Sequence, residues 1–272
     1  MLGLRCDSVE LYISISGLIL AALGTYFAYL QVRQASIRRT QLLKPELSVA
    51  PSGPIIQPAI TCADLRIASV SELEDLGATT DSIIVELVKM DYDNLAGATE
   101  IDVGQVTTWS PIVENNHDGM CLVVNHANQI VAYWHFIPLD DDSYAKAKQG
   151  TLDDGLIRVS DMNILGPPGD YNLYFMIICI APHYRGVRVL RMLLDAFADT
   201  LLMLARKGIY FPELCATAFT PEGEALCRTL HMQQIALHAA RGTVYWMDFR
   251  KMPAGVFYQD DLVALYKHRY KS

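Results

Sequence analysis

The sequence lacks the spacings that mark a zinc site or a redox-active cysteine pair. Its six cysteines contain no C-x-x-C pair, and its seven histidines contain no H-x-x-x-H pair. Several cysteines lie in apolar runs typical of strands, where a cysteine is usually a small buried hydrophobic residue. We therefore expect neither a disulfide bond nor a metal site. No internal repeat or low-complexity tract is visible either, which leaves an ordinary globular domain as the expected bulk of the chain.

Positive charge is also scarce. The chain has 22 Lys or Arg against 30 Asp or Glu, a net charge of −8 at pH 7. Residues 1–44 alone carry +3, which leaves −11 for the remainder. A domain that binds nucleic acid needs a basic face, so we expect no nucleic-acid partner. An acidic domain is compatible with a cationic substrate such as an amine.

One segment lacks charge altogether. Residues 11–30 read LYISISGLILAALGTYFAYL, long enough as a helix to cross the hydrocarbon core of a bilayer. Tyrosines lie towards both ends of it, where aromatic residues favour the membrane interface. We predict a single-pass transmembrane helix; a cleaved signal peptide and a buried core helix are the alternatives. By the positive-inside rule, the basic residues that follow place the rest of the chain in the cytoplasm, at the inner (cytoplasmic) membrane: Arg33, Arg38, Arg39 and Lys44.

Small residues form a stripe on this predicted membrane helix, at Gly17, Ala21, Gly24 and Ala28. Such a stripe lets two helices approach closely and suggests a homodimer, although small residues are common in membrane helices in general. After it, a linker rich in proline covers residues 45–60. The predicted organisation is therefore a transmembrane helix and short stalk (1–44), the linker (45–60), a globular domain (61–252) and a C-terminal helical tail (253–272).

The globular domain alternates between strand and helix patterns. Ser69 and Glu72 have the spacing of a capping box, and Thr220-Pro221 reads as an N-cap followed by proline at the first helical position. Residues 96–118 show no clear pattern and are expected to be irregular. Strands are predicted over 63–68, 120–124, 130–137, 174–181, 213–217, 233–239 and 243–249, and helices after Ser69 and over 81–95, 143–148, 189–207, 222–230 and 259–270.

The most informative segment is 173–194, LYFMIICIAPHYRGVRVLRMLL. An apolar strand runs into Pro182, a short basic turn follows, and the chain then enters an amphipathic helix. A strand that leads into a helix N-terminus creates an anion site, because the first amides of a helix lack internal partners and its dipole favours negative charge there. Arg185, Arg188 and Arg191 add formal positive charge. The segment therefore predicts a site for the pyrophosphate of a nucleotide-type cofactor.

This turn resembles the acyl-CoA-binding motif of the GNAT superfamily of N-acyltransferases, Arg/Gln-x-x-Gly-x-Gly/Ala. Two of the family's glycine positions are filled by Arg188 and Leu190, and glycine there allows the backbone to approach the pyrophosphate closely. The order of predicted elements over residues 63–250 is also similar to a GNAT domain, with His231-Met232 in place of the family's Gly-Phe pair. The matching residues of the turn are Arg185, Gly186, Val187, Arg188, Val189 and Leu190.

The resemblance implies an α+β fold in which a mixed, splayed central sheet is flanked by helices. It also implies acetyl-CoA, or another acyl-CoA, as co-substrate. The pantetheine arm would bind the backbone of Ile178, Cys179 and Ile180 in the gap between two strands. The pyrophosphate would lie over the amides of residues 186–191, which are Gly186, Val187, Arg188, Val189, Leu190 and Arg191, with Arg185 beside them.

Catalytic groups are harder to assign. The family often uses a Tyr in the penultimate helix to protonate the leaving thiolate, and Cys227 occupies that position; a buried cysteine that only packs the helix is the alternative. His135, on a preceding strand, is a candidate general base, with a half-buried structural histidine as the alternative. Other candidates by sequence are Tyr171, Tyr174 and Tyr184 as acids and Asp161 and Glu213 as bases.

The leading hypothesis is a membrane-anchored N-acyltransferase that transfers an acetyl or other acyl group from its CoA thioester to a primary amine, whose owner the sequence does not identify. The replaced glycines and the missing Tyr keep a second hypothesis open, a catalytically inactive acyl-CoA-binding or protein-interaction module tethered to the membrane. A third makes the domain a structural subunit of a membrane complex.

Overall fold

The computed structural model describes residues 65–95, 99–251 and 259–271. Residues 63–185 and 189–272 cluster as one compact unit. The predicted transmembrane helix, its small-residue stripe and the proline-rich linker lie outside the described residues. Within the residues described, no helix has the length and hydropathy needed to cross a membrane.

The described part of the chain is built on one mixed sheet of seven strands, in the order β1-β2-β3-β4-β5-β7-β6. β4 and β5 run parallel, and every other neighbouring pair is antiparallel. This arrangement confirms the predicted α+β class with a mixed central sheet. The strands are β1 (Arg66–Ala68), β2 (Met120–Val124), β3 (Ile130–Leu139), β4 (Gly169–Ile180), β5 (Ile209–Ala218), β6 (Gln233–Leu237) and β7 (Thr243–Asp248).

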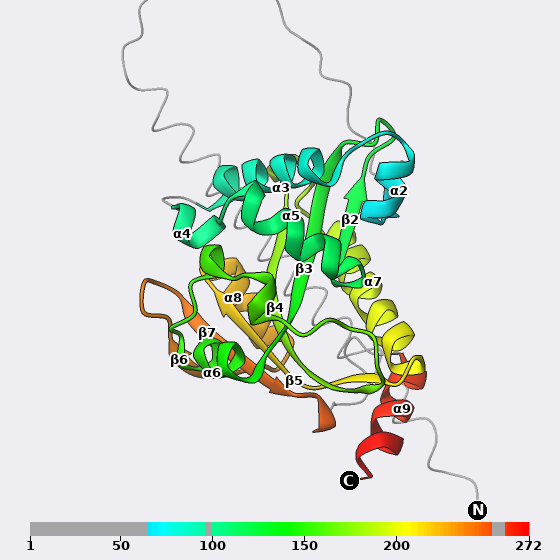
Figure 1. The fold of residues 1–272 in the computed structure, drawn as a ribbon, viewed down its shortest axis with the longest axis vertical. Helices are drawn as coiled ribbons and strands as arrows, with labels where there is room; N and C mark the ends of the chain where they lie inside the picture. The colour runs from blue at the N-terminus through cyan, green and yellow to red at the C-terminus, as the bar shows by residue number, and fades with distance from the viewer. Residues whose placement is uncertain (1–64, 96–98, 252–258, 272) are drawn as a thin grey trace, which may run out of the picture. The chain divides into compact units, whose positions relative to one another are not determined.

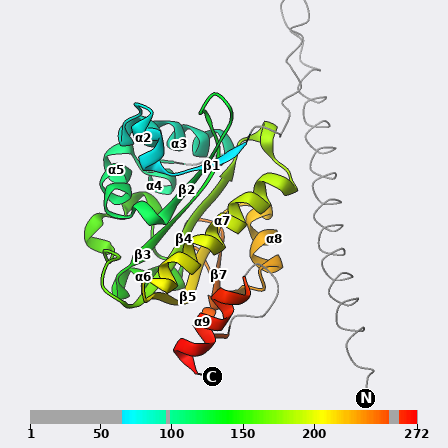
Figure 2. The same ribbon diagram turned by 90° about the vertical axis from the view of Figure 1, so that its right-hand side faces the viewer.

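Helices cover both faces of the sheet (Figures 1 and 2). On one face, α7 (Val187–Arg206), α8 (Pro221–Thr229) and α9 (Asp260–Tyr270) pack on a core that includes Trp134, Phe136 and Phe211. Trp134 donates its indole N–H to the carbonyl of Leu193 in the middle of α7, at 2.9 Å. The helices of the opposite face are α2 (Val70–Asp75), α3 (Thr80–Asn94), α5 (Val106–Asn115) and α6 (Asp141–Gln149).

Local sequence signals place the starts of two helices as predicted. The Ser69 hydroxyl accepts from the Glu72 amide at 3.1 Å and begins α2. The Thr220 hydroxyl accepts from the Gly223 amide at 3.1 Å, with Pro221 at the first helical position of α8. These side chains satisfy amides that the helix itself leaves unpaired.

The prediction that residues 96–118 are irregular was wrong. Much of the segment forms α4 (Glu100–Val103) and α5, although Pro111 lies inside α5. Burial outweighs the cost of the proline, since Trp109, Ile112 and Val113 are all buried on one face of α5. The indole N–H of Trp109 also donates to the carbonyl of Val103 at 2.6 Å, which ties the two helices together.

The connection from β3 to β4 is long and packs on the same face as α3 and α5. It contains α6, η3 (Asp154–Leu156) and η4 (Val159–Asp161), and its buried residues include Ile157 and Met162. At Gly150 (φ 72°) it lies against the end of β6, where an added Cβ would come within 3 Å of Leu237 backbone. The connection therefore closes over the sheet beside β6.

Candidate functional site

β4 and β5 separate half-way along their length. Their parallel pairing runs from Gly169 and Ile209 to Phe175 and Ala216 and ends there. β4 nevertheless continues to Ile180, paired on its other side with β3. The last two residues of β5, Thr217 and Ala218, pair only with β7. The sheet is therefore splayed, with a fork that opens after the Phe175–Ala216 pair.

A β-bulge explains why the strands separate at this point. In the pairing of β3 with β4, His135 lies opposite Ile177 and Phe136 lies opposite Phe175, so Met176 is an extra residue on β4. A bulge bends its strand and increases the local twist. The bulge residue is also the first residue of β4 beyond the last pair with β5, so the bend turns the second half of β4 away from β5.

An apolar pocket occupies the fork. It holds about 760 Å³ of empty space, open solvent at its mouth included. Thr217 is the only lining residue with an oxygen in its side chain, and Cys227 supplies a thiol. The other lining groups come from β4, α7, β5, α8 and β7, and include Phe175, Ile178, Phe197, Ala198, Leu226 and Met247.

The free edge of β4 presents backbone groups to this fork. Ala181 donates its amide to the carbonyl of Val131 on β3 at 2.9 Å. Because successive residues of a strand direct their N–H and C=O groups to alternate sides, Cys179 also faces β3, whereas Ile178 and Ile180 face the side from which β5 has departed. Of the three residues predicted to hold a pantetheine arm, two therefore direct their backbone towards the fork.

The predicted anion-binding turn follows β4 directly. It forms η5 (Pro182–Tyr184) and leads into α7. Arg185 turns its guanidinium back towards β4, where its Nε donates to the Ile180 carbonyl at 3.3 Å and an Nη donates to the Asn94 side chain. Arg188 is exposed, as is Arg191, which forms an i,i+4 ion pair with Asp195 at 3.7 Å.

The two predicted catalytic residues lie in different surroundings. Cys227 lines the pocket from α8, and burial raises the pKa of its thiol to about 12. His135 does not line the pocket. Its ring packs edge-to-face with Trp109, with the two ring centroids 5.9 Å apart. The Nε2 atom has no hydrogen-bond partner within the described residues, and burial lowers the pKa of His135 to about 3. The structure does not bring these two side chains together in the pocket.

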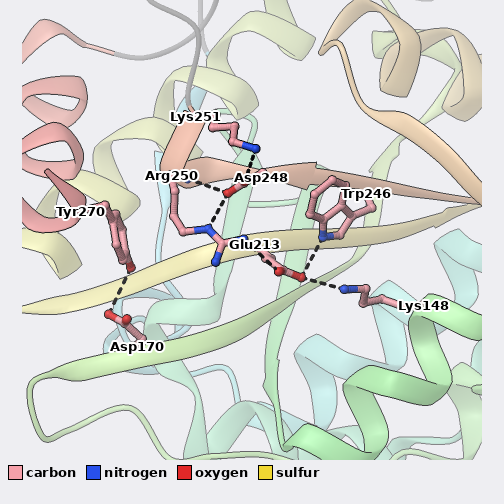
Figure 3. Close-up of polar contacts among 8 residues, drawn as sticks. All are labelled: Lys148, Asp170, Glu213, Trp246, Asp248, Arg250, Lys251 and Tyr270. Carbon is pink, nitrogen blue, oxygen red and sulfur yellow. Dashed lines mark hydrogen bonds and ion pairs between the residues drawn. The ribbon is translucent and has the colours of Figure 1, made fainter. Parts of the chain in front are cut away.

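Glu213, an alternative base by sequence, lies in an ion network in the paired half of the sheet (Figure 3). Its carboxylate accepts from Lys148 Nζ and Trp246 Nε1, each at 2.8 Å, and from Arg250 at 3.2 Å. Partial burial raises the pKa of Glu213, but these hydrogen bonds and the charges of Lys148 and Arg250 outweigh it, so the net pKa is lowered. Such a carboxylate is a poor proton acceptor at neutral pH.

Two buried Tyr–Asp pairs lie on the face of the sheet opposite α7. Tyr133 donates to Asp91, whose carboxylate oxygens are both 2.6 Å from the phenol oxygen. Tyr174 lies 2.7 Å from Asp154 and 3.3 Å from the hydroxyl of Thr217. The sequence did not reveal Thr217 and Asp154 as members of a buried pair or chain. Thr217 is a threonine in a strand and Asp154 an acidic residue in a polar connection, and neither pattern indicates which residue is its partner.

Among the described residues, no group of three or more His, Cys, Asp and Glu side chains is placed to hold a metal ion. The cysteines within the described ranges are all buried and free: Cys121, Cys179, Cys215 and Cys227.

No protein-family model matches the sequence, and no curated protein matches it either. The structure is similar to solved structures at low identity. Diaminobutyrate acetyltransferase EctA from Paenibacillus lautus, in complex with L-2,4-diaminobutyric acid and coenzyme A, has 9% identity and a TM-score of 0.42, over 72% of this chain and 98% of that chain. Arabidopsis thaliana Naa50, in complex with a CoA-based bisubstrate analogue, has 11% identity and a TM-score of 0.41, over 68% and 99%. The loading GNATL domain of CurA from Lyngbya majuscula has 10% identity and a TM-score of 0.43, over 68% and 98%.

By their names, the first of these proteins is an acetyltransferase and the third is a GNATL domain.

Proposed function

We propose that the chain is a GNAT-type N-acyltransferase that transfers an acyl group, in the first instance acetyl, from its CoA thioester to a primary amine. One observation carries the proposal, the apolar pocket in the fork between β4 and β5. The pocket is bounded on one side by strand backbone without a partner strand and on the other by two helices. An extended, mostly apolar ligand with a few amides suits such a slot.

The pantetheine arm of CoA has this character. Its amides would pair with the backbone of Ile178 as a further strand pairs with an edge. The thioester would then lie near the point where the strands separate. The pyrophosphate would lie over the N-terminal turn of α7, where Arg185, Arg188 and Arg191 supply positive charge. Two N–H groups of the Arg185 guanidinium donate to Ile180 and Asn94, and the remaining N–H groups would donate to the phosphate oxygens.

Orientation of the two reactants is the principal chemical contribution of such a site. An amine that attacks a thioester must lose a proton, and the leaving thiolate must gain one. The lining of the pocket contains no carboxylate and no imidazole. This absence favours the second candidate, an acyl-CoA-binding module without activity, and the experiment has to separate the two.

The test uses the full chain purified in detergent. Acetyl-CoA at about 100 times its dissociation constant should add roughly 2.7 kcal/mol to the free energy of unfolding, or about 5–10 °C in Tm for a domain of this size. Incubation with acetyl-CoA and a panel of amines (spermidine, a lysine peptide and a peptide with a free N-terminus) should release free CoA. Binding without CoA release would support the inactive module, and no binding would refute both.

A charge reversal tests the placement of the pyrophosphate. Arg185→Glu should weaken acetyl-CoA binding at least tenfold, because it places negative charge beside the phosphates. Arg206→Glu, at the opposite end of α7 in an exposed ion pair with Asp261, is the matched control and should bind like the wild type. Equal binding by the two variants would refute this placement.

We also propose that residues 11–30 anchor the chain in the inner (cytoplasmic) membrane, with the domain in the cytoplasm and Gly17, Ala21, Gly24 and Ala28 as a dimer contact. The support is the uncharged run and the basic residues after it. The full chain should sediment with membranes after alkaline carbonate washing, whereas Ala21→Arg should not. Extraction of the wild type by carbonate would refute the anchor.

A further inference from the structure

A chain of hydrogen bonds connects the pocket to a buried carboxyl group on the other face of the sheet. The hydroxyl oxygens of Thr217 and Tyr174 are 3.3 Å apart, and the Tyr174 oxygen is 2.7 Å from Oδ1 of Asp154. All three residues are buried, with exposed fractions of 8%, 1% and 6% in that order. They come from β5, β4 and the connection between β3 and β4, so only the folded chain brings them together.

The proton positions in this chain follow from its chemistry. The phenol of Tyr174 has one proton, and the carboxylate of Asp154, the stronger and closer acceptor, takes it. The Thr217 hydroxyl must then donate to the Tyr174 oxygen. Its own lone pairs remain as acceptors, so all the donors point towards Asp154.

Thr217 is placed where a ligand in the fork would meet this chain. It is the first residue of β5 beyond the last pair with β4, and it lines the pocket. No other lining side chain carries an oxygen or nitrogen atom. Among the lining residues, Thr217 is therefore the one whose side chain has an oxygen acceptor for a polar group of a ligand at the fork.

Asp154 is suited to receive a proton at neutral pH. Burial raises the pKa of its carboxyl group to about 7, against the opposing effect of the hydrogen bond from Tyr174. The titratable and charged groups that face it are Tyr174 on β4, His238 after β6, Asp102 of α4 and the adjacent Asp153. Asp102 is itself paired with Arg241 at 3.6 Å.

We propose that Thr217, Tyr174 and Asp154 form a proton relay that takes the proton from the attacking amine and returns it to the leaving thiolate. The relay rests on the proposed acyl transfer. The amine nitrogen bonds to the thioester carbonyl carbon and gives its proton to Thr217, Thr217 passes its own proton to Tyr174, and Tyr174 passes its own to Asp154. When the C–S bond breaks, the same transfers run in reverse, the thiolate is protonated and every group regains its starting state.

In this scheme Thr217 is the group that touches the substrate, whereas Tyr174 and Asp154 act through it. The buried Tyr133–Asp91 pair provides a matched comparison. It lies on the same face of the sheet, has the same hydrogen bond and has a carboxyl group whose pKa burial likewise raises to about 7, yet neither residue lines the pocket.

The experiment measures kcat, KM and the pH dependence of CoA release by the full chain, with the amine of the panel that proves most active. Thr217→Val removes the hydroxyl and keeps the shape, and should lower kcat about 100-fold, the range of general acid–base catalysis, with acetyl-CoA binding within about threefold of wild type. Thr217→Ser should restore most of kcat. Asp154→Asn should lower kcat and abolish the loss of rate on the acid side of a pKa near 7, whereas Asp91→Asn should keep both kcat and that pH profile.

The relay is overturned if Thr217→Val and Thr217→Ser have the same kcat, or if Asp91→Asn changes kcat and pH profile as Asp154→Asn does, since the effect would then reflect structure alone. A wild type that releases CoA while Thr217→Val is fully active refutes the relay and leaves the proposed function intact. A wild type that releases no CoA refutes the proposed function and the relay with it.

Discussion

Phe175 of β4 pairs with Ala216 of β5, and no later residue of β4 pairs with β5. This single relationship defines the fork, because the bulge at Met176 follows at once and the pocket begins there. Every functional statement about the chain depends on that space being available to a ligand.

A larger side chain in the pocket should therefore exclude acyl-CoA. Leu226 lines the pocket from α8 and is only half-buried, so Leu226→Trp can be accommodated without disrupting the core. We expect at least a tenfold weaker binding of acetyl-CoA by calorimetry, with a change in Tm of no more than a few degrees. Ala225→Trp, one position earlier on α8 and outside the pocket lining, is the control and should bind like the wild type. Normal binding by Leu226→Trp would show that the ligand lies elsewhere.

The thiol of Cys227 should react slowly with alkylating reagents. Thiolate is the reactive species, and burial raises the pKa of this thiol from 9.0 to about 12, so its thiolate fraction at pH 8 falls roughly a thousandfold. We expect iodoacetamide to label the Cys227 peptide at least about 100 times more slowly in the folded chain than in urea, as followed by peptide mass spectrometry. Rapid labelling of the folded chain at pH 7.5 would indicate a lowered pKa and would favour Cys227 as an acid–base group.

Local chemistry made much of the fold predictable from the sequence. Ser69 and Thr220 were recognisable as N-caps because a capping hydroxyl accepts a hydrogen bond from the amide only three residues later in the sequence. The apolar run of β4 and the basic turn after it were likewise visible, since the strand, turn and helix are consecutive. These are features whose cause and effect lie a few residues apart.

The parts of the site that could not be predicted depend on contacts between distant residues. The bulge at Met176 results from the register of β4 against β3, and the residue type of Met176 does not indicate it. Tyr174 and Thr217 lie 43 residues apart in the sequence. Asp154, whose carboxyl group accepts from Tyr174, lies in the connection between β3 and β4, and the position of that connection depends on how it packs against the sheet. Arg185, predicted as a phosphate ligand, also hydrogen-bonds Asn94 of α3, 91 residues earlier.

His135 should make the chain sensitive to acid. Burial lowers the pKa of His135 from 6.5 to about 3. The ring is therefore protonated below pH 6.5 in the unfolded chain but only below about pH 3 in the folded chain. The associated stability is complete above pH 6.5 and is lost as the pH falls towards 3, by about 1.4 kcal/mol per pH unit at most. His135→Leu should remove this component from the pH dependence of the free energy of unfolding in urea titrations.

The exposed ring of His268 on α9 supplies the control for this variant. His268→Leu should give a curve parallel to that of the wild type. If His135→Leu also runs parallel to the wild type between pH 6.5 and 4, the ring of His135 is protonated in the folded chain and the buried, neutral arrangement is incorrect.

Asp91 should have the opposite effect on stability. Burial raises the pKa of its carboxyl group from 3.8 to about 7, although hydrogen bonds from Tyr133 and Cys179 oppose the shift. Between these values the folded chain holds a proton that the unfolded chain has lost, so the contribution of Asp91 to stability is complete below about pH 4 and falls as the pH rises through 7. The fall amounts to about 4 kcal/mol at most, at about 1.4 kcal/mol per unit.

Asp91→Asn keeps an acceptor for the Tyr133 phenol without a group that ionises. The free energy of unfolding of the variant, relative to that of the wild type, should therefore rise by a few kcal/mol between pH 4.5 and pH 8. The measurement is a series of urea titrations across that range, with Asp93→Asn, an exposed position on the same helix, as the control that should show no such rise. A constant difference between Asp91→Asn and the wild type would mean that Asp91 is ionised throughout, and the tyrosine would then be bonded to a permanent buried carboxylate.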